Sequence, residues 1–191
     1  MDVQQLAIPG VVVLTPRRFG DDRGFFTEAY NDRTFTEAGI GTVFVQDNHS
    51  FSKAKGTVRG MHYQAPPFAQ AKLVRAITGR VLDVVVDIRK GSPTFGRSAS
   101  AELTSEGGEQ IFVPPGFLHG FLTLEANTHI VYKVDNYYSS KADGAVRFDD
   151  PALGIDWGYD VSAAVLSEKD ANAVSWQDFQ SPFDYVGSTK A

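Results

Sequence analysis

Cysteine is absent from the 191 residues of this chain. A chain without thiols forms no disulfide framework and no thiolate zinc site, and it has no cysteine nucleophile. Any catalysis must therefore rely on His, Tyr, Lys, Arg and carboxylate side chains.

Long apolar stretches are also missing. No run reaches the ~18 consecutive apolar residues that a membrane-spanning helix needs. The opening residues 1–5 lack the basic start and the apolar stretch of a secretory signal. We therefore expect a soluble, cytoplasmic protein that does not associate with membranes.

Clustered positive charge is the third absence. The chain has 18 Lys and Arg against 23 Asp and Glu, a formal net charge of −5, and its basic residues are scattered. Affinity for nucleic acid rests on clustered positive charge, so a nucleic-acid partner is not expected. A small anionic ligand held by a few Arg and Lys side chains is compatible with this balance.

What the chain does contain indicates one all-β domain over residues 1–191. Its length and ordinary composition fit one domain. Short runs of β-branched and aromatic residues recur between turns rich in Gly and Pro, which is typical of a β-sandwich or barrel. The runs expected to form strands are 11–14, 24–26, 42–45, 72–77, 81–88, 110–113, 120–124 and 129–134. Two short helices are expected, over residues 31–38 and over residues 167–173 with Ser167 as the cap.

Residues 81–88 form the most apolar of these runs. The run is apolar on both faces, so it predicts a strand deep in the sandwich. The adjacent aromatic pairs Phe25-Phe26 and Tyr137-Tyr138 are a different case. Neighbouring side chains on a strand point to opposite faces, so one member of each pair must leave the buried side.

Two of the four histidines have unusual surroundings. His62 lies in a stretch that also holds Arg59 and Gly60, and His119 follows the rigid turn at 114–118. A Gly-x-His stretch followed about fifty residues later by Pro-x-Gly-x-x-His resembles the paired motifs of the cupin superfamily, which implies a small jelly roll with the site inside it. Metal-binding cupins continue with His-x-His and Glu, whereas this chain has Tyr63 and Gln64 after His62. Because a divalent ion needs three or four N/O ligands, we expect no metal.

A longer series of segments narrows the resemblance to one family. In matching order, they resemble dTDP-4-dehydrorhamnose 3,5-epimerases from about residue 6 to residue 176. The segments are 23–28, 46–50, 58–64, 71–74, 115–121, 132–138, 149–157 and 166–170.

This resemblance implies a cofactor-independent isomerase. The family inverts C3 and C5 of dTDP-4-dehydro-6-deoxy-D-glucose, giving dTDP-4-dehydro-L-rhamnose for dTDP-L-rhamnose biosynthesis, in which the sugar is destined for surface polysaccharides such as the O-antigen. Each carbon beside the C4 ketone loses a proton on one face and regains one on the other through an enolate. A base and an acid on opposite faces are therefore needed.

By the same resemblance, four residues carry the chemistry. His62 is the base, Asp170 its orienting carboxylate, Tyr132 the acid on the opposite face, and Lys72 the cation beside the enolate oxygen. A carboxylate on one ring nitrogen fixes the tautomer and favours the imidazolium formed after abstraction. Without the resemblance, Tyr132 would be a core tyrosine, Lys72 a solvated strand charge and Asp170 a capping or surface carboxylate.

The remaining predicted site residues suit a nucleotide diphosphate sugar. By resemblance, Tyr138 stacks on thymine, and the planar fork of an Arg binds two diphosphate oxygens at once. An ordinary turn arginine is the competing interpretation of Arg23. The full substrate-binding set is Phe19, Arg23, Phe26, Glu28, Gln46, Asn48, Arg59, His119, Tyr138, Asp143 and Lys169.

Three positions depart from the family pattern: Ser140 replaces a Pro, Asp143 replaces a longer acidic residue, and Phe148 replaces a Trp. Asp143 puts the reach of one nucleotide contact in question, while the four catalytic positions are unaffected. Three alternatives to the full reaction stay open: a C3-only epimerase, a ketoisomerase on a related nucleotide 4-ketosugar, and a non-catalytic sugar-binding jelly roll.

A homodimer is expected. The family pairs sheets across a two-fold axis, and the apolar strand at residues 10–14 would otherwise be an exposed edge.

Overall fold

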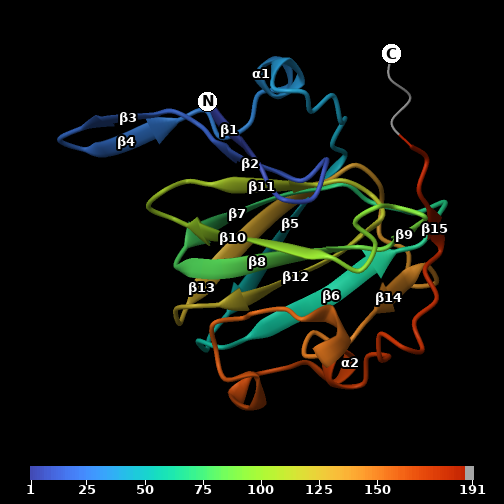
Figure 1. The fold of residues 1–191 in the computed structure, drawn as a ribbon. Coiled ribbons are helices and arrows are strands. Elements are labelled where there is room, and N and C mark those ends of the chain that lie inside the picture. Colours follow the sequence, from blue (N-terminus) through green and yellow to red (C-terminus); the bar gives the residue numbers. More distant parts are fainter. Residues whose placement is uncertain (188–191) are drawn as a thin grey trace.

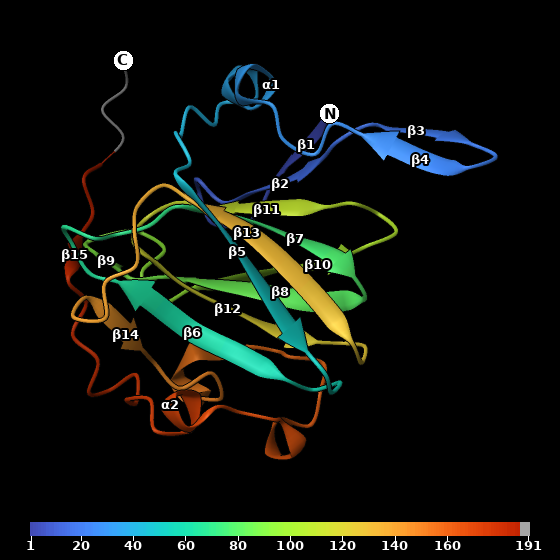
Figure 2. The ribbon, with the colours of Figure 1, turned by 180° about the vertical axis from the view of Figure 1, so that it is seen from behind.

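Two antiparallel sheets face each other in the computed structural model, which describes residues 1–187 (Figures 1 and 2). The six-stranded sheet has the order β1-β2-β11-β7-β13-β5, and the five-stranded sheet has the order β10-β8-β12-β6-β14. The strands of the larger sheet are β1 (Asp2–Gln5), β2 (Val12–Thr15), β5 (Gln46–Ser52), β7 (Lys72–Thr78), β11 (Gln110–Val113) and β13 (Thr128–Val134). Those of the smaller sheet are β6 (Val58–Gln64), β8 (Arg80–Asp87), β10 (Ser98–Thr104), β12 (Phe117–Thr123) and β14 (Asp143–Ala145).

Every pairing within the two sheets is antiparallel, and most neighbours are distant in sequence. This is the cupin-type jelly roll that the sequence predicts. Two smaller pairs lie outside the sheets: the hairpin of β3 (Arg18–Asp21) and β4 (Gly24–Thr27), and the parallel pair of β9 (Arg89–Lys90) and β15 (Phe183–Asp184).

The main core lies between the sheets. Val74 and Ile130 from the larger sheet pack there with Val85 and Phe121 from the smaller one. A second core, containing Val84, covers the outer face of the smaller sheet beneath the C-terminal segment. Strand β8 therefore contributes buried residues to both faces, which confirms the prediction for residues 81–88.

Helical structure is short, as expected. Helix α1 (Asp32–Glu37) is capped by Asn31 and buries Phe35 on the outer face of the larger sheet. Helix α2 (Glu168–Ala171) is capped by Ser167, as predicted, and two single 3-10 turns span Pro151–Leu153 and Val161–Ala163. Within residues 1–187, no helix is long and apolar enough to cross a membrane.

Two predictions about strands are wrong. Residues 42–45 form no strand; the chain enters the sheet only at Gln46, after Val45 donates to the Val134 carbonyl. The apolar strand near the N-terminus is not an edge either, because β1 and β11 pair with its two sides. The edge-strand argument for a dimer therefore fails.

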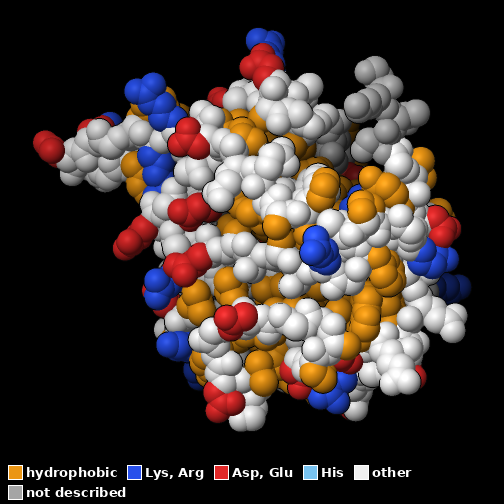
Figure 3. Space-filling view, in the orientation of Figure 1, with side chains coloured by type: hydrophobic (Ala, Val, Ile, Leu, Met, Phe, Trp, Pro, Cys, Tyr) orange, Lys and Arg blue, Asp and Glu red, His pale blue; other side chains and the backbone are white. Residues whose placement is uncertain are grey.

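On the face shown in Figure 3, Lys and Arg side chains are interspersed with Asp and Glu rather than gathered into one area.

Candidate functional site

His62 and Asp170 form a close pair at one wall of a cavity. His62 lies on β6, and its Nε2 is 2.5 Å from Oδ1 of Asp170 on α2. Asp170 is almost fully buried, and its Oδ2 accepts a hydrogen bond from the hydroxyl of Ser167 at 2.9 Å. Burial raises the pKa of Asp170, but the hydrogen bond and charge of His62 and the hydroxyl of Ser167 outweigh it and hold the pKa below its usual value. An ionised Asp170 then accepts the Nε2 proton, which leaves Nδ1 of His62 with a free lone pair.

A second His-carboxylate pair lies directly beside the first. His119 on β12 is the register partner of His62. Its Nε2 lies 2.8 Å and 3.0 Å from the two oxygens of Asp83, which points inward from β8 and is fully buried. Burial lowers the pKa of His119, and the attraction of Asp83 opposes this only in part. A neutral ring that donates to Asp83 through Nε2–H is the state that this environment favours.

Two glycines allow β6 and β12 to approach closely at this point. A Cβ on Gly60 would lie 2.5 Å from the Cα of Gly120, far inside van der Waals contact, and Gly60 has a φ of +134°. The register between the strands also shifts between His119 and Phe121. Glycine is therefore required where the two histidine-bearing strands meet.

Lys72 lies at the inner end of the same cavity. It begins β7 and shares its inward-facing side with Val74 and Ala76. Burial lowers the pKa of Lys72 from 10.5 to about 8, while Asp83 and Asp143 favour the ammonium and Lys169 opposes it. Lys72 is thus a cation with a lowered pKa at the wall of a cavity whose lining residues are mostly polar.

Tyr132 comes from the opposite sheet. It lies on β13, where even-numbered residues face inward, and its register partner on β5 is Asn48. Burial raises the pKa of Tyr132, with Arg59 opposing and Asp143 adding to this effect. The phenol is therefore protonated at neutral pH and able to donate.

The cavity that these groups line has a volume of about 350 Å³. Arg59 borders it, held in place by hydrogen bonds to the Ser52 hydroxyl at 3.1 Å and to the Phe51 carbonyl at 2.8 Å. Its lining residues are Ser50, Thr57, Val58, Arg59, His62, Lys72, His119, Phe121, Tyr132, Val165, Leu166, Ser167 and Asp170. Predicted residues from four strands and one helix thus meet in one space.

Three further predicted residues form a cluster next to α2. The carboxylate of Asp143 accepts hydrogen bonds from Lys169 at 2.5 Å and from the Tyr138 hydroxyl at 3.1 Å. The Tyr138 ring is 62% exposed, so it is free to stack on a planar group. Tyr138 does not continue the inward face of the strand that carries Tyr132, because β13 ends at Val134. Although Asp143 is shorter than the acidic residue of the family pattern, its carboxylate lies within hydrogen-bond distance of both Lys169 and Tyr138.

Gln46 and Asn48 lie on β5, and the Gln46 amide donates to the Asn48 carbonyl oxygen at 2.7 Å. Both share the inward side of the strand with Ser50, which lines the cavity. They are therefore placed beside Tyr132, at the edge of the site.

Four further predicted residues neither line the cavity nor belong to the groups next to it. Phe19, Arg23 and Phe26 lie on the β3–β4 hairpin, which projects from the end of the molecule opposite α2 (Figures 1 and 2). Arg23 contacts Asp21 at 2.5 Å, as expected of a turn arginine, and Glu28 lines a shallow hollow near α1.

Asp83 and Ser50 are site residues that the sequence interpretation did not identify. A carboxylate inside the apolar run 81–88 was the available signal for Asp83, because a buried charge requires a partner. Among residues 1–187, the Ser50 hydroxyl is the buried side-chain polar atom that lacks a hydrogen-bond partner. No sequence pattern marked it.

A second hollow, of about 300 Å³, lies on the outer face of the larger sheet. Arg75 and Lys133 border it, and the residue that it shares with the 350 Å³ cavity is Tyr132. No group of three or more His, Asp or Glu side chains placed to hold a metal ion occurs within residues 1–187.

Comparisons with known proteins agree with this geometry. The sequence model of the dTDP-4-dehydrorhamnose 3,5-epimerase family matches residues 5–178. A dTDP-4-dehydrorhamnose 3,5-epimerase from Sinorhizobium fredii is 48% identical over 97% of this chain and 95% of its own.

Solved structures are similar as well. A dTDP-6-deoxy-D-glucose-3,5-epimerase from Legionella pneumophila, in complex with dTDP-4-keto-L-rhamnose, has a TM-score of 0.91 and 38% identity, with 97% of this chain and 99% of that chain covered. A 3'-monoepimerase from Streptomyces bikiniensis, in complex with dTDP-quinovose, has a TM-score of 0.83 and 34% identity, with 89% and 85% covered.

Proposed function

Because the chain belongs to the dTDP-4-dehydrorhamnose 3,5-epimerase family, we propose that it inverts C3 and C5 of dTDP-4-dehydro-6-deoxy-D-glucose to give dTDP-4-dehydro-L-rhamnose. The observation that carries this proposal is the pairing of a carboxylate-held His62 with Tyr132 from the opposite sheet, around one cavity. Inversion needs a base and an acid on opposite faces of the sugar, and the two sheets provide these faces.

Abstraction is assigned to Nδ1 of His62. Nε2–H is engaged by Asp170 at 2.5 Å, so Nδ1 is the nitrogen that can accept a proton from C3 or C5. The C–H electron pair moves into the ring to form the enolate, and the imidazolium that results is stabilised by the ionised Asp170. Asp170 is a positioning residue in this scheme, since it acts through His62.

The enolate oxygen at C4 is assigned to Lys72. Once a bound sugar fills the cavity and displaces its water, a preformed cation at the wall stabilises developing negative charge more strongly than the same cation would in bulk solvent. The neighbouring His119, fixed by Asp83, adds a polar group at the same end of the cavity. The rate then depends on Lys72 carrying its proton.

Reprotonation is assigned to Tyr132. Its phenol donates a proton to the carbanion carbon from the side of the larger sheet, and His62 lies on the side of the smaller sheet. The stereocentre is thereby inverted. The raised pKa of Tyr132 keeps the proton available before the transfer.

The nucleotide is assigned to the open side of the cavity. The exposed Tyr138 ring is available to stack on thymine, and Lys169 and Arg59 are cations suited to the diphosphate. Gln46 and Asn48 supply amide groups beside Tyr132. Arg23, Phe19, Phe26 and Glu28 complete the proposed set, which requires a second chain.

We infer that the protein is a homodimer in which the β3–β4 hairpin of one chain reaches the cavity of the other. Phe19, Phe25 and Phe26 on this hairpin are 53%, 59% and 69% exposed. Exposed apolar clusters of this kind are typical of interaction sites. A partner hairpin at the mouth of the cavity would bury these rings and bring Arg23 to the ligand.

Three further expectations belong to this proposal: residues 1–191 act as one domain, the protein is cytoplasmic, and no metal or cofactor takes part. The reaction as written moves only protons, and every proton-transfer group in it is a side chain of the chain.

The test is incubation of dTDP-4-dehydro-6-deoxy-D-glucose with the protein in deuterated water, followed by NMR. We expect deuterium at C3 and at C5 and formation of the L-rhamno product. Deuterium and inversion at C3 alone would instead identify a 3'-monoepimerase like the Streptomyces relative. A product with the keto group moved along the ring would identify a ketoisomerase, and no exchange at all would leave a sugar-binding protein.

A further inference from the structure

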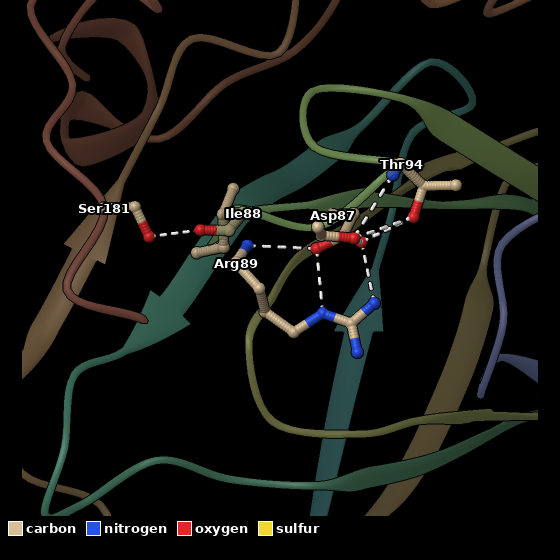
Figure 4. Close-up of polar contacts among 6 residues, drawn as sticks. Asp87, Ile88, Arg89, Thr94 and Ser181 are labelled. Carbon is tan, nitrogen blue, oxygen red and sulfur yellow. Dashed lines mark hydrogen bonds and ion pairs between the residues drawn. The ribbon is translucent and has the colours of Figure 1, made fainter. Parts of the chain in front are cut away.

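The C-terminal segment packs against the end of the barrel behind Lys72. Strand β15 pairs in parallel with β9, and the amide of Tyr185 donates to the Lys90 carbonyl at 2.8 Å. The Ser181 hydroxyl donates to the carbonyl of Ile88 (Figure 4). The same hydroxyl accepts a hydrogen bond from the amide of Phe183 at 3.1 Å. The C-terminal segment is thus held by hydrogen bonds on both sides of Phe183.

The anchor rests on a buried polar cluster. The Asp87 side chain is fully buried and accepts hydrogen bonds from Arg89 at 2.7 and 2.9 Å and from the hydroxyls of Ser92 and Thr94, both at 2.6 Å (Figure 4). Burial alone would raise the pKa of Asp87, but these donors lower it to about 2. Asp87 therefore remains ionised and holds Arg89 in one orientation.

Arg89 connects this cluster to the C-terminal segment. Its guanidinium lies 4.5 Å from the centre of the Phe117 ring on β12 and 5.1 Å from that of Tyr185. A cation between two aromatic rings binds both. The Tyr185 side chain is thereby fixed against the strand that carries His119.

Phe183 is the residue that this anchoring places. It is 9% exposed, belongs to the core on the outer face of the smaller sheet, and packs edge-on against Tyr63 at 6.4 Å between ring centres. It also lines a residual void of about 10 Å³ together with Lys72, His119, Gln64 and Gln70. That volume holds one water molecule at most.

Lys72 and His119 line both this void and the catalytic cavity. They form the partition between the two, and Phe183 lies on the far side of it. We propose that Phe183 is a positioning residue of the catalytic site, a stopper that closes the rear of the barrel, so that water reaches Lys72 and His119 from the catalytic cavity and not from behind. This inference rests on the proposed function for its catalytic consequence, but the closure itself can be measured without turnover.

Removing the ring would open this region to water. Truncating a buried Phe leaves a void many times larger than one water requires. The groups around it include an ammonium, an imidazole and two amides, so the void has the polar partners that stabilise water inside a protein. Because burial is the main cause of the lowered pKa of Lys72, solvent at its rear returns the pKa toward 10.5.

The experiment is NMR titration of protein labelled with [ε-13C]lysine, with the Lys72 signal assigned by its loss in Lys72→Arg. In the wild type we expect a Lys72 midpoint near 8. Phe183→Ala should raise it by about one pH unit, and Phe183→Leu, which refills most of the space, should leave it near the wild-type value.

Phe179→Ala is the matched control. Phe179 packs against the same Tyr63 ring, at 5.5 Å, and against the same core, but it does not line the void that contains Lys72. Its truncation should lower the melting temperature while leaving the Lys72 midpoint unchanged. If Phe183→Ala does not fold, Ser181→Ala takes its place. This variant keeps the Phe183 ring but removes its anchor, and it should also raise the Lys72 midpoint.

An unchanged Lys72 midpoint in folded Phe183→Ala, or in Ser181→Ala if that variant is needed, would overturn the proposal. An equal rise in Phe179→Ala would do the same, because it would indicate general loosening rather than closure. In the epimerase assay, Phe183→Ala should lower kcat about tenfold with little change in KM, and move the alkaline limb of kcat to higher pH. A wild-type protein with no epimerase activity would reject the proposed function, while the titration would still decide the role of Phe183.

Discussion

His62 and His119 are register partners on adjacent strands, and each donates through Nε2 to its own buried carboxylate. The two rings nevertheless have different surroundings. The side chain of His62 is 28% exposed and that of His119 is 8% exposed, with Lys72 next to the latter. The more accessible ring is the one suited to exchange a proton with a ligand, and the enclosed ring is suited to orient one.

Substitutions of His62 and Asp170 distinguish the residue that takes the proton from the residue that positions it. His62→Ala should abolish deuterium incorporation at both C3 and C5, because the neighbouring imidazole on that face, His119, is the enclosed ring held by Asp83 and orients the ligand rather than taking its proton. Asp170→Asn should slow incorporation by roughly two to four powers of ten, with the affinity for dTDP little changed. His129→Ala, on the outer face of the larger sheet, is the control. Exchange at the wild-type rate in His62→Ala would remove His62 as the base.

Tyr132→Phe tests the other face of the sugar. The base can still remove a proton and return it, so deuterium should enter C3 or C5 while little inverted product forms. The substitution keeps the ring, so the free energy of unfolding should change by no more than about 1 kcal/mol. NMR of the sugar and thermal denaturation measure the two effects, and Tyr30→Phe is the control. Normal product formation would show that water or another side chain reprotonates the enolate.

The pKa of Lys72 predicts how activity depends on pH. Activity should fall as the pH rises through about 8, since the neutral amine no longer stabilises the enolate. In Lys72→Arg the charge persists, so this alkaline loss should disappear, although the rate at pH 7 is lower. Profiles of kcat from pH 6 to pH 10 test this, and an identical alkaline limb in both proteins would assign the titration to another group.

The free energy of unfolding should rise with pH over part of the range in which activity falls. The folded protein binds fewer protons than the unfolded chain between about pH 8 and pH 10.5, because burial lowers the pKa of Lys72. The contribution of Lys72 to the free energy of unfolding therefore rises with pH in that window. Denaturant titrations of the wild type and of Lys72→Met measure the difference.

The shared-site dimer makes a prediction that no monomeric arrangement satisfies. Arg23→Ala and His62→Ala should each be nearly inactive alone. A mixture of the two should regain activity after subunit exchange, because some dimers then contain one site with an intact hairpin and an intact His62. Absence of recovery, or a light-scattering mass near 20.8 kDa, would contradict the arrangement.

Activity should survive exhaustive chelation. The sequence lacks the His-x-His and Glu ligands of metal-binding cupins and has no Cys. A loss of activity that one divalent ion restores would show that a metal takes part.

Strands with a clear apolar pattern could be predicted from the sequence, and strands β5 and β6, which carry polar site residues, could not. Strand β5 runs Gln46–Ser52 and has almost no apolar pattern, because its inward side faces the cavity and its outward side faces solvent. The apolar run at 42–45 next to it predicts a strand that the structure does not contain. Apolar periodicity detects burial in a core, and β5 is not buried in one.

The candidate site could be predicted only through the family resemblance. Asp170 contacts His62 across 108 positions of sequence, and such a distance leaves no periodic signal. The hairpin residues Phe19, Arg23 and Phe26 were predicted in the same way, and their part in the site rests on the proposed second chain. A single sequence does not indicate whether a residue contributes to the site of its own chain or to that of a partner chain.

The proposed base and acid belong to different layers of the sandwich, His62 to the smaller sheet and Tyr132 to the larger. Packed sheets lie about 10 Å apart, so the thickness of the core between Val85 and Ile130 also fixes the gap into which a sugar ring must fit. The separation of the two sheets thus sets the distance between the two proposed proton-transfer groups. A core substitution that changed this thickness would alter both transfer distances at once, without touching either catalytic side chain.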